Sequence, residues 1–211
     1  GHLHHRLMEM GHGQRRGERK EAAMVMDYPP IEKDVASFPV TPNLANYEEM
    51  RKNWSWDAVR AELDRPNGLV NQAHECIDRH ALGARRDKVA MIWEGANGTV
   101  ERHTFDEMRR QSNRFANVLR GLGVAKGERV FLFADRIPEL YFALFGVLKT
   151  GAIAAPLFSA FGPEPVAERV RRAEGVGIIT TPRLLPKIEQ ILPDCPTVKW
   201  VMVIDREGKG V

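Results

Sequence analysis

A short stretch of the chain, PLFSAFGPEPVAERV at 156–170, combines features that could place a ligand. An apolar run ends at Phe158, two small residues follow, and Phe161 closes the segment before Gly162 breaks the chain. A helix pattern then begins at once. Tight turns between a strand and a helix often bring backbone against a ligand, and they are often packing turns only. The surrounding elements must distinguish these two interpretations.

Histidine and cysteine residues gather in two places, and neither spacing predicts a metal site. In HECIDRH, at 74–80, the offsets of two and six residues do not converge on one helix face. The second group lies in an aperiodic stretch rich in Gly and Arg, and its members are His2, His4, His5 and His12. We therefore expect a structural helix at 74–80 and no metal ligands in the chain.

The composition is that of an ordinary globular protein. The chain has 211 residues, of which 43% are hydrophobic and 28% charged, with a net charge of +3. Much of the positive excess lies in GQRRGERK at 13–20, which is typical of a solvated tail and not of a nucleic-acid surface. Two cysteines without a CxxC motif favour a reducing compartment, and no apolar run reaches the roughly 18 residues of a membrane helix. We expect a cytoplasmic protein that contacts neither nucleic acid nor membrane.

Three regions follow from the patterning. Residues 1–23 have no periodicity and predict a disordered or non-native extension, with Met24 or Met26 as a plausible natural start. Residues 24–70 carry several prolines and aromatics and predict an N-terminal wrapping segment with a short helix capped by Ser55. Residues 71–211 are regular and predict one large, incomplete α/β domain.

Strands and helices alternate through that last region. A hairpin is expected at 89–105, with strands at 89–93 and 99–105, and Thr104 and Glu107 have the spacing of a capping box that opens a helix. Further strands are expected at 129–134, 152–158, 177–181 and 198–204, and helices at 71–80, 104–123, 138–151, 163–174 and 183–192. Such alternation predicts an α/β fold, a mostly parallel sheet with helices on both faces. Ligands of such sheets bind at the carboxyl ends of the strands, where Phe158 lies.

Several short motifs occur in the order found in one enzyme family. Over residues 42–204 the chain resembles the N-terminal part of the AMP-forming acetyl-CoA synthetases, within the acyl-adenylate-forming superfamily. The motifs that carry this resemblance are Asp78-Arg79-His80, Trp93-Glu94-Gly95, Phe115-Ala116-Asn117, Gly127-Glu128-Arg129-Val130, Pro138-Glu139 and Phe158-x-x-Phe161-x-Pro163-Glu164.

The resemblance implies a ligase that uses ATP, Mg²⁺ and CoA. Such an enzyme activates acetate or a related short acid to an acyl-adenylate, releases pyrophosphate, then passes the acyl group to CoA and releases AMP. The family's Ser/Thr/Gly-rich phosphate loop with its Lys is not found, and the chain ends in mid-domain for this family. We therefore expect a fragment without catalytic residues, inactive alone, whose partner is the remainder of its own polypeptide.

The same resemblance implies which residues lie near CoA. In the family the turn after Phe158 has glycines beside CoA, whereas this chain has Ser159 and Ala160. Arg side chains often bind phosphate by paired hydrogen bonds. The candidate cofactor-binding residues are Phe158, Phe161, Arg169, Arg183 and Lys187, with the last two expected at i, i+4.

Two other functions remain open at this point. A stand-alone flavodoxin-like binding module, for instance a receiver-type phosphoacceptor, would use Asp135 after the strand at 129–134, but the other acidic and basic residues of such a site are not in place. A truncated regulator that binds CoA without catalysis would have the same sequence features.

Overall fold

A computed structural model describes residues 28–63 and 66–206. These described residues divide into two units, with the division between Trp54 and Ser55. In the first, the described helices are η1 (Val35–Ser37) and α1 (Tyr47–Asn53), and the Asn46 side chain caps α1 by accepting a hydrogen bond from the backbone N–H of Glu49 at 3.1 Å. The expected extension at 1–23 and the histidines within it lie outside the described residues.

The second unit begins with short helices. Ser55 caps α2 (Trp56–Glu62) as predicted, and η2 (Pro66–Gly68) follows. The helix expected at 71–80 is present: Gln72 and Ala73 are helical, a π-helical stretch η3 (His74–Asp78) follows, and it continues into α3 (Arg79–Ala81). Asn71 caps the start of this helix, because its side-chain oxygen accepts hydrogen bonds from the backbone N–H groups of Ala73 and His74.

A hairpin leads into the longest helix. Strands β1 (Val89–Glu94) and β2 (Val100–Thr104) pair antiparallel, as the sequence predicts. The capping box of Thr104 and Glu107 opens α4 (Phe105–Gly121), and both of its reciprocal hydrogen bonds are formed. Gly123, with φ of 78°, adopts a left-handed conformation just beyond that helix and so ends it.

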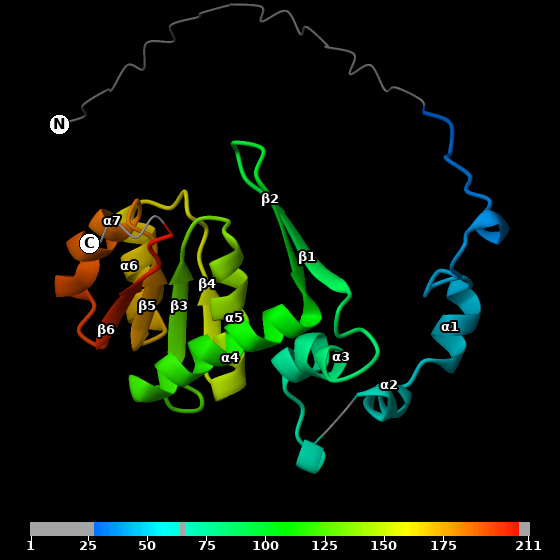
Figure 1. Ribbon diagram of the computed structural model, residues 1–211, viewed down its shortest axis with the longest axis horizontal. Helices are drawn as coiled ribbons and strands as arrows, with labels where there is room; N and C mark the ends of the chain where they lie inside the picture. Colours follow the sequence, from blue (N-terminus) through cyan, green and yellow to red (C-terminus); the bar gives the residue numbers. More distant parts are fainter. Residues whose placement is uncertain (1–27, 64–65, 207–211) are drawn as a thin grey trace, which may run out of the picture. The chain divides into compact units, whose positions relative to one another are not determined.

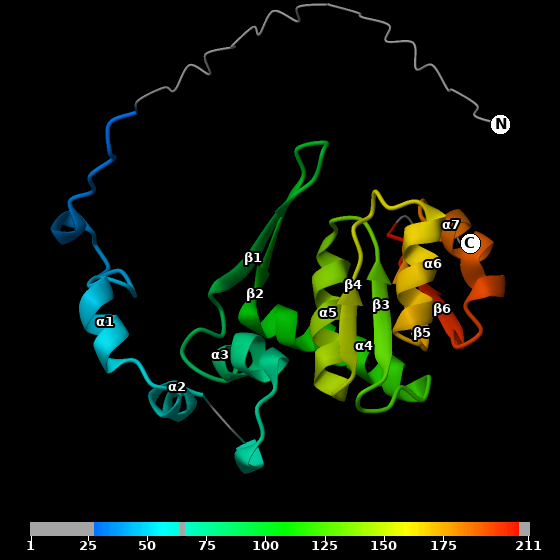
Figure 2. The same ribbon diagram turned by 180° about the vertical axis from the view of Figure 1, so that it is seen from behind.

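Four parallel strands form the main sheet in the order β4-β3-β5-β6 (Figures 1 and 2). The strands are β3 (Arg129–Phe133), β4 (Ile153–Pro156), β5 (Gly177–Thr180) and β6 (Trp200–Val203). The helices between and beside them are α5 (Pro138–Thr150), α6 (Pro163–Arg172) and α7 (Leu185–Ile191), and a short η4 (Leu192–Asp194) ends the last of these.

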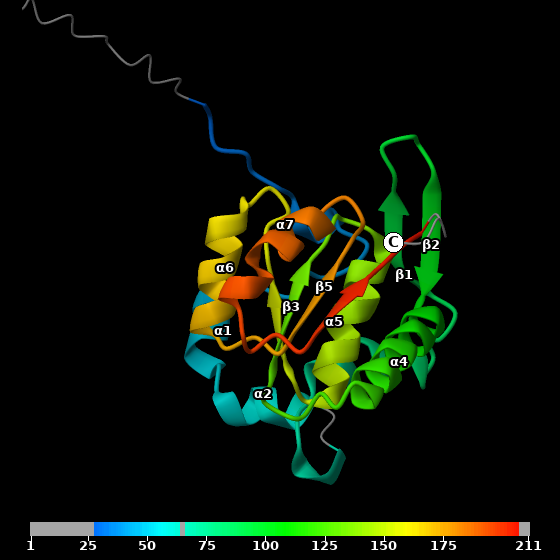
Figure 3. The same cartoon turned by 90° about the vertical axis from the view of Figure 1, so that its left-hand side faces the viewer.

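The sheet is covered by helices on both faces, as expected, with α6 and α7 on one face and α4 and α5 on the other (Figure 3). Alternate residues of β3 serve the two sides: Phe131 and Phe133 pack with α6 and α7, whereas Val130 and Leu132 pack with α4 and α5. A strand buried on both faces accounts for the unbroken apolar run RVFLFA in the sequence.

Candidate functional site

The turn that leaves β4 holds the first two candidate residues side by side. The rings of Phe158 and Phe161 meet edge to face with centroids 5.7 Å apart, and the N–H of Phe161 donates to the carbonyl of Phe158 at 3.0 Å. Phe161 packs against the core beneath α6, while Phe158 is 56% exposed. Neither Ser159 nor Ala160 has a positive φ, so this turn does not require the family's glycines.

Arg169 of α6 lies over the same turn. Its guanidinium carbon is 4.7 Å from the centroid of the Phe161 ring, and its Nη1 donates to the carbonyl of Pro165 at 2.8 Å. A groove of about 590 Å³ runs here between β4 and α6. Its lining includes Phe158, Phe161, Arg169 and Arg172, which gives it aromatic walls and a positively charged side.

Lys187 and Arg183 hold neighbouring turns together. The Lys187 ammonium on α7 donates to the carbonyl of Phe161 at 2.8 Å, which fixes the turn after β4. Arg183 pairs with Asp135, which follows β3, and the Thr181 hydroxyl donates to the same carboxylate at 3.0 Å. The expected i, i+4 helical relation of Arg183 and Lys187 is wrong, because α7 begins only at Leu185 and Arg183 lies in the turn before it.

The five candidate residues therefore come from turns and helices at one edge of the sheet, the carboxyl ends of β3, β4 and β5. Sequence reasoning missed Arg172, and it considered Asp135 only as a phosphoacceptor. Their positions in the sequence could have indicated them, because Asp135 and Thr181 are polar residues just after the ends of two strands that are neighbours in the sheet. Thr180, at the end of β5, is fully buried and its hydroxyl has no hydrogen-bond partner within the described residues.

Charge pairing at this edge changes the acidity of Asp135. The hydrogen bond from Arg183 lowers the pKa of the Asp135 carboxyl below its usual range, and the Thr181 hydroxyl acts in the same direction, against the effect of burial. A carboxyl whose pKa is lower in the folded state stabilises the fold above its unfolded pKa of about 3.9. That contribution disappears as pH falls through the folded-state pKa.

Asp135→Asn is expected to lower the free energy of unfolding at pH 7 by about 0.5–1 kcal/mol, a small value because Arg183 is largely exposed. The difference from wild type should vanish below the folded-state pKa, where both proteins lack the charge. Denaturant unfolding from about pH 2 to pH 7 measures it. Glu168→Gln, which breaks the exposed pair with Arg172, is the control and should cost less than about 0.3 kcal/mol at every pH. If the loss of unfolding free energy in Asp135→Asn stayed the same at every pH, the stabilisation would not come from the charge of Asp135.

The described residues contain neither a metal-ligand cluster nor a membrane-spanning helix. Across residues 28–63 and 66–206, no three His, Cys, Asp or Glu side chains lie close enough to hold a metal ion. None of the helices described there has the length and apolar character needed to cross a bilayer.

Comparison with known proteins assigns the family. Residues 77–210 match the family described as AMP-binding enzyme. The chain belongs to this family. It is 42% identical over 170 residues to the acetyl-coenzyme A synthetase of Bacillus subtilis (strain 168). The matched region is 80% of this chain and 29% of that protein. The resemblance to acetyl-CoA synthetases that the motifs predict is thereby confirmed.

Two solved structures have the same fold. An acyl-CoA synthetase from Brucella canis superposes with a TM-score of 0.70 at 26% identity, over 78% of this chain and 29% of that one. An anthranilate CoA ligase in complex with anthranoyl-AMP gives a TM-score of 0.59 at 27% identity, over 69% of this chain and 26% of that one. The α/β fold is confirmed, and the chain spans less than a third of the length of these relatives.

Proposed function

We propose that this chain forms part of an ATP-dependent acyl-CoA synthetase that activates acetate or a related short acid and transfers it to CoA. The observation that carries the proposal is the 42% identity with an acetyl-coenzyme A synthetase over 170 residues. A carboxylate is a poor electrophile, and adenylation supplies the leaving group that lets the CoA thiol attack. The membership of the AMP-binding enzyme family favours this function over the receiver-type module, whose acceptor Asp135 is engaged by Arg183.

The described residues fit one of the three expected cofactors. Within residues 28–63 and 66–206 no carboxylate cluster suits Mg²⁺ and no glycine-rich loop followed by Lys suits the phosphates of ATP, so the proposal assigns no described residue to either. The groove between β4 and α6 fits CoA better. It offers an exposed aromatic ring in Phe158 for apolar contact and two guanidinium groups, Arg169 and Arg172, for phosphate.

We assign distinct parts to the candidate residues. Phe158 and Arg169 line the groove and would contact CoA directly. Phe161 supports both of them, since its ring meets that of Phe158 edge to face and lies under the Arg169 guanidinium. Lys187 and Arg183 would act indirectly, by fixing the turns after β4 and β3 through Phe161 and Asp135.

A chimera tests the proposed activity. The matching segment of the Bacillus subtilis relative is replaced by residues of this chain, and acetate-dependent ATP–pyrophosphate exchange is measured. The proposal expects exchange that needs both acetate and ATP. A folded chimera without exchange overturns it. If that inactive chimera still bound CoA, the truncated regulator would become the better description.

Phe158→Ala in the active chimera is expected to raise KM for CoA about tenfold, the effect of losing about 1.4 kcal/mol of aromatic contact. The rate of ATP–pyrophosphate exchange should be unchanged, because adenylation does not use CoA. Ile153→Ala is the control, since Ile153 is similarly exposed but begins β4, whereas Phe158 lies in the turn beyond the end of that strand. Equal effects of the two substitutions on KM for CoA, or a loss of exchange with Phe158→Ala, would remove Phe158 from the CoA site.

A further inference from the structure

A second pocket lies away from the candidate CoA groove. Its volume is about 750 Å³, within the range of small-molecule sites. It is bounded by the segment before η3, by η3 itself, by α4 and by the last turn of α5. Lys149 of its lining precedes β4, whereas Phe158 of the CoA groove follows β4, so the two hollows lie at opposite edges of the sheet.

Most of the residues that line this second pocket are polar. Only Leu69 and Ala116 are apolar among its ten residues, and the rest are Asn67, Asn71, His74, Asp78, Asn113, Asn117, Arg120 and Lys149. Asn113, Ala116, Asn117 and Arg120 are spaced i, i+3, i+4, i+7, so they form one stripe along α4. Amide groups both donate and accept hydrogen bonds, which suits a ligand that carries hydroxyl groups.

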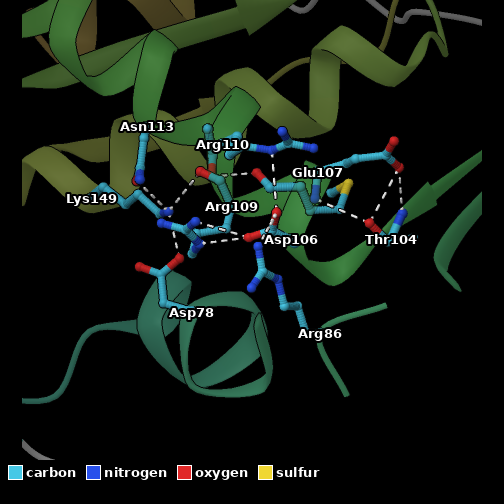
Figure 4. Close-up of polar contacts among 11 residues, drawn as sticks. Asp78, Arg86, Thr104, Asp106, Glu107, Arg109, Arg110, Asn113 and Lys149 are labelled. Atoms are coloured by element: carbon cyan, nitrogen blue, oxygen red, sulfur yellow. Dashed lines mark hydrogen bonds and ion pairs between the residues drawn. The ribbon is translucent and has the colours of Figure 1, made fainter. Parts of the chain in front are cut away.

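A buried ion pair builds one wall of the pocket. The Lys149 side chain is only 9% exposed and its ammonium lies between Asp78 and Asn113, donating to their side-chain oxygens at 2.6 and 2.7 Å (Figure 4). Asp78 reaches this position from the π-helix, a rare geometry that is frequent at functional sites. Burying charge is costly, and apolar residues of similar volume often give equal stability, so stability alone does not account for this ion pair.

The pocket carries an excess of positive charge. Asp78 balances Lys149, whereas Arg120 is exposed at the pocket and has no carboxylate partner among the described residues. Arg binds phosphate oxygens through paired, charge-assisted hydrogen bonds. From these residues we propose that this pocket binds a small hydroxylated organic phosphate, with Arg120 holding the phosphate and the Asn67 and Asn117 side chains holding the hydroxyl groups. This pocket shares no lining residue with the proposed CoA site.

Titration calorimetry of the 211-residue chain with ribose 5-phosphate tests this assignment, with ribose and inorganic phosphate as partial ligands. We expect saturable binding of ribose 5-phosphate, weaker binding of inorganic phosphate and none of ribose. Arg120→Gln should weaken binding about tenfold through loss of the charge-assisted contact. Arg114→Gln is the matched control, since Arg114 is an exposed arginine of the same helix outside this pocket, and it should change affinity less than about twofold.

Backbone amide shifts in NMR spectra locate the ligand in the same samples. The proposal expects shifts at Asn71, His74, Asn117 and Arg120. Three results would each overturn it: no saturable binding, equal weakening by Arg120→Gln and Arg114→Gln, or shifts confined to the groove at Phe158 and Arg169. The second would indicate attraction to surface charge alone, and the third would place phosphate in the candidate CoA groove.

Discussion

Gly146→Ala is expected to lower the free energy of unfolding by about 2–3 kcal/mol, although alanine is the better helix former by up to about 1 kcal/mol. Gly146 lies in α5 where that helix crosses α4. A Cβ atom at this position would stand 2.6 Å from the Cβ of Phe115, 3.1 Å from the carbonyl oxygen of Ser112 and 3.2 Å from the backbone nitrogen of Ala116. These are backbone or backbone-proximal atoms, so relief requires the two helices to separate.

Gly121→Ala is the matched control for that crossing. Gly121 ends α4, has no positive φ, and a Cβ there would meet no atom within 4 Å. The substitution should be neutral or stabilising by up to about 1 kcal/mol, which is the helix propensity difference alone. Denaturant unfolding of both variants measures the two effects. Similar unfolding free energies for Gly146→Ala and Gly121→Ala would show that α4 and α5 do not cross as closely as described.

Local signals in the sequence predicted the elements well. Three helix ends depend on residues close in the sequence: the capping box at Thr104, the serine cap at Ser55 and the left-handed Gly123. A short stretch of sequence is therefore enough to predict them. The unbroken apolar run of β3 also indicated its two-sided burial, and with it the layers of the domain. The family resemblance then supplied the candidate CoA-binding residues, and their role stays a prediction.

Contacts between distant residues were beyond this kind of reasoning. Asp135 and Arg183 are 48 residues apart, and Asp78 and Lys149 are 71 residues apart. No spacing in the sequence indicates that either pair is in contact. In the sequence, Gly146 does not differ from its apolar neighbours in the helix. Only the close approach of α4 in the structure shows why a residue without a Cβ stands there. The helix predicted at 71–80 contains a π-helical stretch at His74–Asp78 that no local residue pattern indicated.

Asp78→Asn is expected to lower the free energy of unfolding by about 3 kcal/mol at pH 7, since it leaves the Lys149 ammonium buried without its carboxylate. The other two acceptors, Asn113 Oδ1 and the carbonyl of Arg109, are uncharged and compensate only in part. Asp57→Asn is the control, because Asp57 pairs with Arg60 on the surface and its loss should cost less than about 0.5 kcal/mol. Adding Lys149→Met to Asp78→Asn should recover part of the stability, which a double-mutant cycle measures.

The pH dependence separates this charge effect from a simple loss of packing. Burial lowers the pKa of Lys149, and the hydrogen bond from its ammonium to Asp78 opposes that shift. Between the folded-state pKa and the unfolded value of about 10.4 the unfolded chain binds more protons, so stability rises with pH across this window. Without Asp78 the folded-state pKa falls further and the window opens at lower pH. The deficit of Asp78→Asn should therefore shrink from pH 7 towards about pH 10, as lysine becomes neutral in both proteins. A deficit that stays constant over that range would mean that Asp78 acts through its shape and hydrogen bonds, and that the charge of Lys149 does not depend on it.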